Sequence, residues 1–441
     1  MQRIKIGFVG FTAFIIAVWF LSRGTILAAG GQQAWAAEFT QITGILSIAM
    51  MAFSNLLSIR PRWMEPSLDG LDKMYRLHKW LGIGGLGLGV LHWLTASGDG
   101  RPPQGTTSLA ANPATAAAGA LQTWLSQYHG LAHGVGQPAL FVLIALVAVA
   151  LIKVIPYRLF AKTHILVSIA FFLLAFHSVV LMKAAYWSQP IGWLTLALTG
   201  IGVGAGLISL YRYFLGGGTA KSTVISAEYY PELRVLETNL HVDQGWPGHK
   251  PGQFAFVTTE RKEGAHPFTI ATDWDAADRN IGFIAKELGD HTATLREQFA
   301  HGKPAVIEGP FGNFTFDDDR PRQIWIGAGI GITPFVARMR KLSKEPDDKI
   351  VDLYHSTADV SELALSKMRA DAAAANVRLH ILLSSKDGRL DAPRIFSDVP
   401  DWKSASVWFC GPTGFGAGLR KAFVSEGLSA RNFHQEIFEM R

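Results

Sequence analysis

The sequence predicts a multi-domain protein in which a bundle of six membrane-spanning helices is followed by an antiparallel β-barrel and then by an α/β domain. Three observations predict this order. Hydrophobic residues make up 49% of the 441-residue chain and charged residues 17%, and the long apolar runs lie before residue 215. The glycine triplet at residues 216–218 marks a break, after which short alternating strand patterns and then strand and helix patterns follow. The predicted domains are residues 1–215, 219–318 and 322–441.

Six apolar stretches are long enough to cross the hydrocarbon core of a bilayer, which is about 30 Å thick. They cover residues 5–22, 39–59, 77–96, 137–155, 162–182 and 191–214. Lysine and arginine flank the ends on one side, for example Arg60, Lys79 and Lys162, so the positive-inside rule places both termini in the cytoplasm. We therefore expect an integral membrane protein, in a bacterium one of the inner (plasma) membrane. The first stretch also fits the outline of a signal peptide.

The charge and the cysteine content exclude several classes of protein. The net charge is +6, but the cationic residues gather at the ends of the apolar stretches and form no basic tail, so we expect no nucleic-acid partner. Cys410 is the only cysteine in the sequence, which excludes an intrachain disulfide and a CxxC metal or redox site.

Four histidines lie inside predicted membrane spans, where an ionisable side chain indicates a functional site. His78 and His92 on the third span are 14 residues apart, and His164 and His177 on the fifth are 13 apart. Each spacing covers roughly 20 Å of helix. Because the two spans run in parallel, His78 can face His164 and His92 can face His177. Two facing pairs of imidazoles predict two six-coordinate haems suited to electron transfer; for a single histidine, a hydrogen bond to a main-chain carbonyl is the alternative.

Two features of these spans leave alternatives open. A spacing of 13 residues turns the second histidine about 140° around an ideal helix, so either the fifth helix is locally rewound or the haems lie at different azimuths. The third span also contains a run of glycines, which would give room for a flat macrocycle or form a helix-packing face. They are Gly82, Gly84, Gly85, Gly87 and Gly89.

This half of the chain resembles the ferric reductase and NADPH oxidase superfamily, whose members bind two b-type haems through histidine pairs on the third and fifth helices. The segment His266, Pro267, Phe268 and Thr269 resembles the flavin signature of ferredoxin-reductase-type domains in the form typical of NADPH oxidases. The resemblance implies bound FAD, with Phe268 packed on the flavin and the Thr269 hydroxyl near its N5 atom. Plant-type reductases have arginine where His266 stands, which leaves the role of His266 open.

A second motif follows at residues 283–292, where a strand, Lys286, a turn at Gly289 and Thr292 at an expected helix start form a suitable cradle for a diphosphate. The resemblance implies that Lys286 and Thr292 contact the FAD diphosphate. For the flavin segment taken alone, the alternative is an ordinary strand with a buried phenylalanine and threonine.

The last domain opens with a buried-type strand at residues 323–326 and a glycine-rich turn into a helix, a pattern that brings a dinucleotide phosphate close to the main chain. A second strand ends at Cys410, where the superfamily places a cysteine near the nicotinamide, and Phe438 resembles its terminal aromatic, which shields the flavin. The predicted nucleotide-binding residues are Gly327, Gly329, Gly331, Thr333, Pro334, Cys410, Gly411 and Pro412. Thr269, Cys410 and Phe438 are the predicted catalytic residues.

The sequence thus predicts an NAD(P)H oxidase or ferric-chelate reductase type oxidoreductase that passes electrons through FAD and two haems to an acceptor on the outer face. The acceptor is either O2 or a ferric or cupric chelate. The strand at residues 350–354 lacks a following arginine, so NADPH is favoured only modestly over NADH, with Ser356, Lys386 or Arg389 as candidate contacts for the 2′-phosphate. Tyr128, His129 and His133 either take part in chemistry at the outer haem or pack above it. The rival functions are a haem-containing redox sensor and an electron donor to a periplasmic protein.

Overall fold

The fold is described from a computed structural model of the chain. The structure describes residues 2–22, 32–68, 70–98, 123–152, 154–260, 264–287 and 294–435. Three predicted site residues, Gly289, Thr292 and Phe438, lie outside these ranges. The chain divides into two compact units, Met1–Gly217 and Gly218–Arg441, and each unit is considered separately below.

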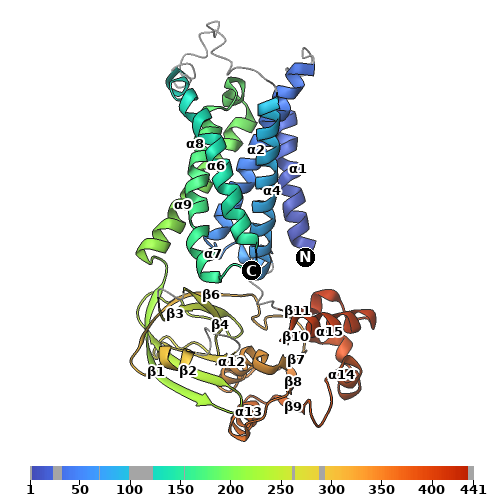
Figure 1. The fold of residues 1–441 in the computed structure, drawn as a ribbon. Helices are drawn as coiled ribbons and strands as arrows, with labels where there is room; N and C mark the ends of the chain where they lie inside the picture. Colours follow the sequence, from blue (N-terminus) through green and yellow to red (C-terminus); the bar gives the residue numbers. More distant parts are fainter. Residues whose placement is uncertain are drawn as a thin grey trace. The chain divides into compact units, whose positions relative to one another are not determined.

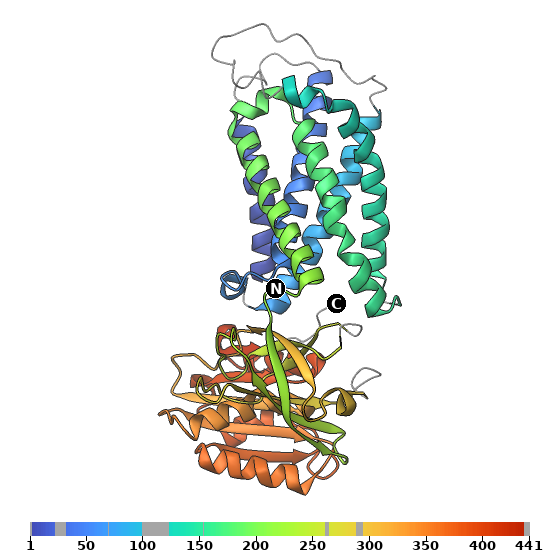
Figure 2. The same ribbon diagram turned by 90° about the vertical axis from the view of Figure 1, so that its left-hand side faces the viewer.

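The first unit is a bundle of long helices, of which α1, α2, α4, α6, α8 and α9 run side by side (Figures 1 and 2). Helix α2 is the most buried of the apolar helices, because residues such as Ile48, Ala49 and Ala52 contact helices on several sides. The described helices are α1 (Gln2–Leu21), α2 (Gln32–Ser58), α3 (Glu65–Leu68), α4 (Leu71–Gly98), α6 (His129–Leu151), α7 (Tyr157–His164), α8 (Leu166–Val180), η2 (Ala184–Ser188) and α9 (Pro190–Leu215).

Five segments of the described residues are long and apolar enough to cross a membrane, one fewer than the six predicted. They are Ile4–Leu21, Trp35–Ser58, His129–Leu151, Leu159–Val180 and Pro190–Leu215. The third predicted span is the exception. It forms the 28-residue helix α4, but Lys73, Arg76 and Lys79 in its first turns and the glycines that follow lower its mean hydropathy. The number of six spans is therefore not established by the helices themselves.

The fifth predicted span is interrupted between its two histidines. Helix α7 ends at His164, Ile165 adopts a turn, and α8 begins at Leu166. An interruption changes the angle by which the following residues are rotated about the axis, so His177 need not lie where an unbroken helix would place it.

The glycines of α4 form a helix-packing face. A Cβ atom on Gly85 would lie 3.0 Å from Met51 Cγ, and one on Gly89 would lie 3.1 Å from Ser47 Oγ, both on α2. The Ser47 hydroxyl also donates a hydrogen bond of 2.8 Å to the Gly85 carbonyl. Glycine therefore allows the two helices to approach closely, whereas a Cβ on Gly87 would meet nothing within 4 Å.

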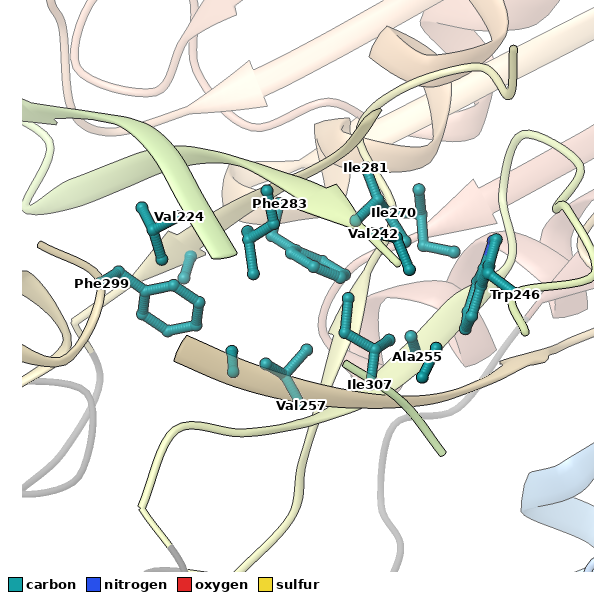
Figure 3. Packing of buried hydrophobic residues seen from close by; sticks show 14 of the residues in the cluster. Val224, Val242, Trp246, Ala255, Val257, Ile270, Ile281, Phe283, Phe299 and Ile307 are labelled. Atoms are coloured by element: carbon teal, nitrogen blue, oxygen red, sulfur yellow. The ribbon is translucent and has the colours of Figure 1, made fainter. Parts of the chain in front are cut away.

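The second unit begins with a six-stranded antiparallel sheet in the order β4-β3-β6-β1-β2-β5. Its core lies between the curved strands, where Val257, Phe283, Phe299 and Ile307 point toward one another (Figure 3). The edge strands β4 and β5 approach each other at a single bridge, from Ile270 to Phe283. The sheet is thus strongly curved but is not the closed barrel that the sequence predicted. Its strands are β1 (Ala220–Tyr230), β2 (Val235–Val242), β3 (Phe254–Thr258), β4 (His266–Thr269), β5 (Asn280–Lys286) and β6 (Pro304–Phe311).

A parallel five-stranded sheet follows, in the order β11-β10-β7-β8-β9. Strand β7 is buried along most of its length, as expected for a strand of a sheet covered on both faces. The strands are β7 (Arg322–Ala328), β8 (Ile350–Thr357), β9 (Arg378–Leu383), β10 (Ser406–Cys410) and β11 (Phe433–Gln435), and the main helices are α12 (Thr333–Leu342), α13 (Glu362–Ala374), α14 (Ala392–Asp398) and α15 (Thr413–Ser425). The carboxyl ends of β7, β8 and β10 lie beside one another, which brings the glycine-rich turn and Cys410 to the same edge.

Candidate functional site: two histidine pairs and an interdomain cleft

The structure brings the four predicted histidines together in two pairs. The ring centroids of His78 and His164 are 5.9 Å apart, and those of His92 and His177 are 6.2 Å apart. A metal ion between two imidazoles lies about 2 Å from each nitrogen, which together with the size of the rings requires the centroids to be separated by about 6 Å. Both pairs therefore have the spacing that axial ligation of a haem iron requires.

Main-chain carbonyls fix the protonation of three of these rings. The Nδ1 atoms lie 2.9 Å from the Ser54 carbonyl for His78, 2.8 Å from the Thr40 carbonyl for His92 and 2.8 Å from the Ala132 carbonyl for His177. A carbonyl oxygen can only accept a hydrogen bond, so Nδ1 carries the proton in each ring. The lone pair of a neutral ring is then on Nε2, the nitrogen available to a metal, and this is the usual support for a histidine ligand.

His164 differs from the other three rings. Its Nδ1 atom is buried and has no hydrogen-bond partner among the described residues. The nearest ring besides His78 is that of Phe160, one helical turn earlier, with centroids 5.0 Å apart. The position of His164 is therefore set by packing, whereas those of the other three rings are set by hydrogen bonds as well.

Two glycines that the sequence analysis did not single out make room for the rings at one end of the bundle. A Cβ atom on Gly136 would lie 2.4 Å from Nδ1 of His177, and one on Gly44 would lie 3.0 Å from Nδ1 of His92. Only glycine at 136 lets α6 approach close enough for the Ala132 carbonyl to reach His177. Because the partners are main-chain atoms and missing side chains, no residue type in the sequence marked these contacts.

The third histidine at this end, His133, lies beside His177, with ring centroids 6.4 Å apart. However, Nδ1 of His177 is already directed at the Ala132 carbonyl of α6, the helix that carries His133, and the ring of His177 also lies beside that of His92 on α4. Tyr128 packs against Trp124 and Phe176, and His129 is exposed. The arrangement favours packing for Tyr128 and leaves His129 and His133 at the surface of α6.

The predicted flavin residues lie on β4 and β5. Phe268 is half-buried and packs against Phe283 and Phe299 of the sheet core, and Thr269 pairs with Phe254 at the end of β4. His266 and Pro267 pair with Val257 and Phe256. Lys286, predicted to contact the FAD diphosphate, forms an ion pair with Asp359 in the parallel-sheet domain. This pair holds the Lys286 ammonium across the space between the two sheets.

The two glycine turns predicted for nucleotide binding touch each other. A Cβ atom on Gly331 would lie 2.2 Å from the Cys410 carbonyl oxygen, and one on Gly411 would lie 2.7 Å from Ala328. Gly329 has a φ of +56° and Gly411 a φ of +156°, values that side chains with a Cβ rarely adopt. Glycine is therefore required here both for backbone conformation and for close approach.

The residues that flank these turns have defined roles in the helix starts. The Thr333 hydroxyl donates to the Ile330 carbonyl over 2.9 Å, and Pro334 occupies the first turn of α12, where its missing N–H is not needed. Pro412 is the N-cap residue of α15. Cys410 is buried, with 4% of its surface exposed, and Gly327 pairs with it across β7 and β10. The main chain, and not the thiol, thus forms most of this edge.

A cleft of about 840 Å³, counted with the space at its mouth, lies between the two sheets of the second unit. Lys286 and Gly329 are the only predicted binding residues among its described lining residues; Lys386 and Arg389 do not line it. Sequence analysis assigned no role to the other polar residues of the lining, which come from five separated segments: Tyr230, Glu237, Arg340, His355, Thr357, Asp359, Ser361, Lys367 and Asp371.

Ion pairs join the two walls of this cleft. Arg340 Nη2 of α12 donates to Glu237 Oε1 of β2 over 2.9 Å, and Lys367 Nζ of α13 donates to Glu228 Oε2 of β1 over 2.7 Å. The hydrogen bond from Lys367 to Glu228 raises the pKa of the Lys367 ammonium. Burial lowers the pKa of His355 to about 4, although its Nδ1 donates to the Gly327 carbonyl over 3.3 Å. A neutral His355 therefore lies at the carboxyl end of β8 at physiological pH.

Comparison with known families agrees with this arrangement. Residues 43–175 match the family of the ferric reductase like transmembrane component, and residues 221–321 match an FAD-binding domain family. The first match includes all of α4 and the histidines His78, His92 and His164. His177 lies two residues beyond the end of this match.

Three curated relatives are similar to parts of the chain. An NADPH oxidoreductase of Mycobacterium tuberculosis is 34% identical over 142 residues, which are 31% of this chain and 37% of the relative. The reductase component of an aromatic O-demethylase from Amycolatopsis sp. is 28% identical over 42% of this chain and 60% of the relative. The heavy chain of a superoxide-generating NADPH oxidase from Dictyostelium discoideum is 29% identical over 42% of this chain and 37% of the relative.

The chain thus spans between about a third and three fifths of the length of these relatives. The two family matches follow one another along the chain, first the transmembrane component and then the FAD-binding domain. Together with the apolar helices of the first unit, they indicate an integral membrane protein in which a ferric reductase like transmembrane component precedes an FAD-binding domain.

Proposed function

We propose that this protein is an oxidoreductase that takes electrons from NAD(P)H and carries them through FAD and two b-type haems across the membrane to an acceptor on the outer face. The observation that carries this proposal is that the four histidines lie in two facing pairs. Their ring separations of 5.9 and 6.2 Å, and the three Nδ1 atoms directed at main-chain carbonyls, fit two bis-histidine haems. The names of the relatives, an NADPH oxidoreductase and an NADPH oxidase heavy chain, support the donor.

Bound nicotinamide, FAD and haem would supply hydride and one-electron chemistry, and the protein holds them in place. His78 and His164 would ligate the inner haem and His92 and His177 the outer haem, each through Nε2. The Gly327, Gly329 and Gly331 turn and Gly411 would let the dinucleotide approach the main chain at the start of α12. Lys286 would bind the FAD diphosphate, which requires that its pair with Asp359 opens. Phe268 and Thr269 would flank the flavin, with Cys410 and Phe438 near the nicotinamide.

The topology that fits this proposal has six spans, with α4 as the third. Its hydropathy is low because it carries haem-ligating histidines, packing glycines and cytoplasmic cations. Both termini would then be cytoplasmic, residues 1–215 would form the dihaem domain, residues 219–318 the FAD domain and residues 322–441 the NAD(P)H domain. The membrane would be the inner (plasma) membrane of a bacterium. Insertion of a reporter active only outside the cytoplasm between residues 99 and 122 tests this topology, and a reporter that stays inactive there while the protein is made would contradict it.

Haem content and NAD(P)H oxidation of the full-length purified protein in lipid nanodiscs test the function as a whole. We expect two haems per chain with bis-histidine spectra, and one FAD per chain. NADH and NADPH are supplied in separate assays, and the reduction of the haems is followed in each. Less than one haem per chain, or no reduction of haem by either nucleotide, contradicts the proposal.

The acceptor is either O2 or a ferric or cupric chelate. Cytochrome c reduction that is abolished by superoxide dismutase indicates O2, and fast anaerobic reduction of a ferric chelate indicates a metalloreductase. Haems that fill without turnover on either acceptor would favour a redox sensor or a donor to a periplasmic protein.

A further inference from the structure

A buried ion pair lies at the same end of the helix bundle as the pair of His92 and His177. Glu38 of α2 is 3% exposed, and both of its carboxylate oxygens accept hydrogen bonds. Lys183 Nζ donates to Oε1 over 2.6 Å, and the Tyr186 hydroxyl donates to Oε2. Burying a carboxylate is costly unless an opposite charge and hydrogen bonds compensate for the lost water. These contacts therefore hold the segment that contains Lys183 and Tyr186 against α2.

The segment that Glu38 holds follows directly after α8, the helix that carries His177. The main-chain N–H of Leu181 ends the helix by donating to the His177 carbonyl over 3.0 Å. Gln41, one turn after Glu38 on α2, contacts the same segment, because its Nε2 lies 3.5 Å from the Leu181 carbonyl oxygen and its Oε1 lies 3.4 Å from the main-chain nitrogen of Lys183. Two side chains of α2 thus fix the position of the residues that end α8.

The same turn of α2 supports the other ring of the pair. Thr40 lies between Glu38 and Gln41, and its carbonyl accepts the hydrogen bond of 2.8 Å from Nδ1 of His92. Residues within one helical turn move together, because the main-chain hydrogen bonds of the helix join them. The turn at residues 38–41 therefore contacts His92 directly and His177 through the end of α8.

The other histidine pair is remote from this turn. Ser54 of α2, whose carbonyl accepts the hydrogen bond from His78, follows Thr40 by 14 residues. This separation corresponds to roughly 20 Å along a helix. A change in the contacts of Glu38 should therefore affect one histidine pair and leave the other as it is.

The hydrogen bond at Nδ1 affects the strength of a histidine ligand and, through it, the reduction potential of the metal. Donation of the N–H to a carbonyl raises the basicity of Nε2 and fixes the orientation of the ring. A more basic ligand stabilises ferric iron more than ferrous iron, which lowers the reduction potential. Loosening the turn that carries Thr40, together with the end of α8, should therefore raise the potential of a haem held by His92 and His177.

We propose that Glu38 is a positioning residue for the haem held by His92 and His177. Its ion pair with Lys183 joins α2 to the end of α8 and thereby keeps the reduction potential of that haem low, which favours transfer of the electron to the acceptor. Glu38 acts through the Thr40 carbonyl and through the segment that follows His177. The inference rests on the proposed function, because it requires that both haems are bound.

Redox titration of both haems in the full-length protein in lipid nanodiscs, followed by absorbance, tests this role. Glu38→Gln keeps the size of the side chain and removes the charge that pairs with Lys183. We expect the equilibrium constant for reduction of one haem to rise about tenfold, or about 59 mV for a one-electron couple. The haem that is missing from His92→Ala identifies the affected one. Unchanged potentials, or equal shifts of both haems, would overturn the inference.

Haem content separates the possible failures. An unmodified protein with fewer than two haems per chain would count against the proposed function and not against the role of Glu38. If Glu38→Gln itself binds fewer haems, loss of the haem held by His92 and His177 supports the inference, and loss of the haem held by His78 and His164 overturns it.

Variants of Lys183 separate the effect of position from that of charge. By charge alone, Lys183→Met should lower the potential, because the Glu38 carboxylate is no longer compensated. If the ion pair acts by joining α2 to the end of α8, the potential rises instead, as in Glu38→Gln. Lys183→Arg keeps a cation at this position and should restore the potential of the unmodified protein. A lower potential in Lys183→Met would overturn the positioning role.

Tyr186→Phe is a milder variant of the same contact, and Glu65→Gln is the control. Tyr186→Phe keeps the ring and removes the hydroxyl, which donates to Glu38 and accepts a hydrogen bond of 3.0 Å from Trp19 Nε1. It should raise the potential of the same haem by less than Glu38→Gln does. Glu65 is also buried, at 6% exposed, but it lies on α3, beyond the far end of α2. An equal rise at this haem in Glu65→Gln would contradict a specific role for Glu38.

Discussion

The two units of this protein hold their candidate groups by different means. In the first unit, the histidine rings are oriented by main-chain carbonyls of neighbouring helices and by the space that glycine leaves. In the second unit, side chains take this role, because ion pairs such as those of Lys286 with Asp359 and Arg340 with Glu237 join the walls of the cleft. A site built on main-chain contacts stays formed as long as the helices pack. A site held by ion pairs between domains can open to admit a nucleotide and close again.

The largest effect should come from replacing one of the histidine rings. His92→Ala or His177→Ala should remove one haem per chain, because a haem held by a single imidazole in this bundle loses one of its two protein bonds. The pyridine haemochrome assay measures the haem content per chain. Full haem content in both variants would exclude the pairing of His92 with His177, and His133→Ala, which leaves that pair intact, is the control.

The side-chain network of the second unit should be sensitive to acid. Burial lowers the pKa of His355 to about 4, below an unfolded value of about 6.5. The unfolded chain therefore binds the extra proton first, and stability that is complete above about pH 6.5 is lost as the pH falls toward about 4. At about 1.4 kcal/mol per pKa unit, the loss is roughly 3 kcal/mol.

Denaturant unfolding of the full chain, followed by tryptophan fluorescence between about pH 4.5 and 7, measures this loss. His355→Gln should flatten the dependence of the free energy of unfolding on pH, and His301→Gln, at an exposed position, should leave it unchanged. An unaltered slope in His355→Gln would show that other groups cause the acid sensitivity.

The hydrogen bonds between the histidine rings and main-chain carbonyls in the first unit should be disturbed when the space left by a glycine is filled. In Gly136→Ala the new Cβ atom would lie 2.4 Å from Nδ1 of His177, which forces the ring or α6 to move, at about 1–3 kcal/mol for such overpacking. We expect a lower occupancy of one haem and a changed low-spin EPR signal. Gly134→Ala on the same helix, where a Cβ meets nothing within 4 Å, should behave like the unmodified protein. Equal haem occupancy in the two variants would contradict the importance of this contact.

The smallest predicted effect concerns the ion pair that closes the cleft. Lys286→Gln should weaken FAD binding about tenfold, or about 1.4 kcal/mol, because a hydrogen bond to a charged group is lost. Asp359→Asn should strengthen FAD binding, since it releases Lys286 for the diphosphate. Fluorescence titration with FAD measures both dissociation constants, and Lys250→Gln, which breaks an exposed pair with Asp317, is the control. If both variants weaken FAD alike, the pair supports the cleft and does not compete with FAD.

Much of the fold followed from local patterns. The apolar runs predicted the helices, including α4, and the glycine triplet at residues 216–218 predicted the boundary near Gly217. The extent of closure of the antiparallel sheet did not follow, because it depends on pairing between β4 and β5, which are distant from each other in the sheet order. The boundary between α7 and α8 at Ile165 did not follow either, because no proline or glycine stands there to mark it.

The sequence by itself determined which residues can carry chemistry: four histidines in membrane spans, the flavin segment around Phe268 and the glycine turns at Gly327 and Gly411. These are local signals, in which residue type and spacing limit what the main chain and side chains can do. Only the tertiary structure decided how those residues are held. The carbonyls of Ser54, Thr40 and Ala132, the unsupported His164 and the pairing of Lys286 with Asp359 all join segments far apart in the chain. A main-chain oxygen is present at every position, so only packing selects the one that meets a ring.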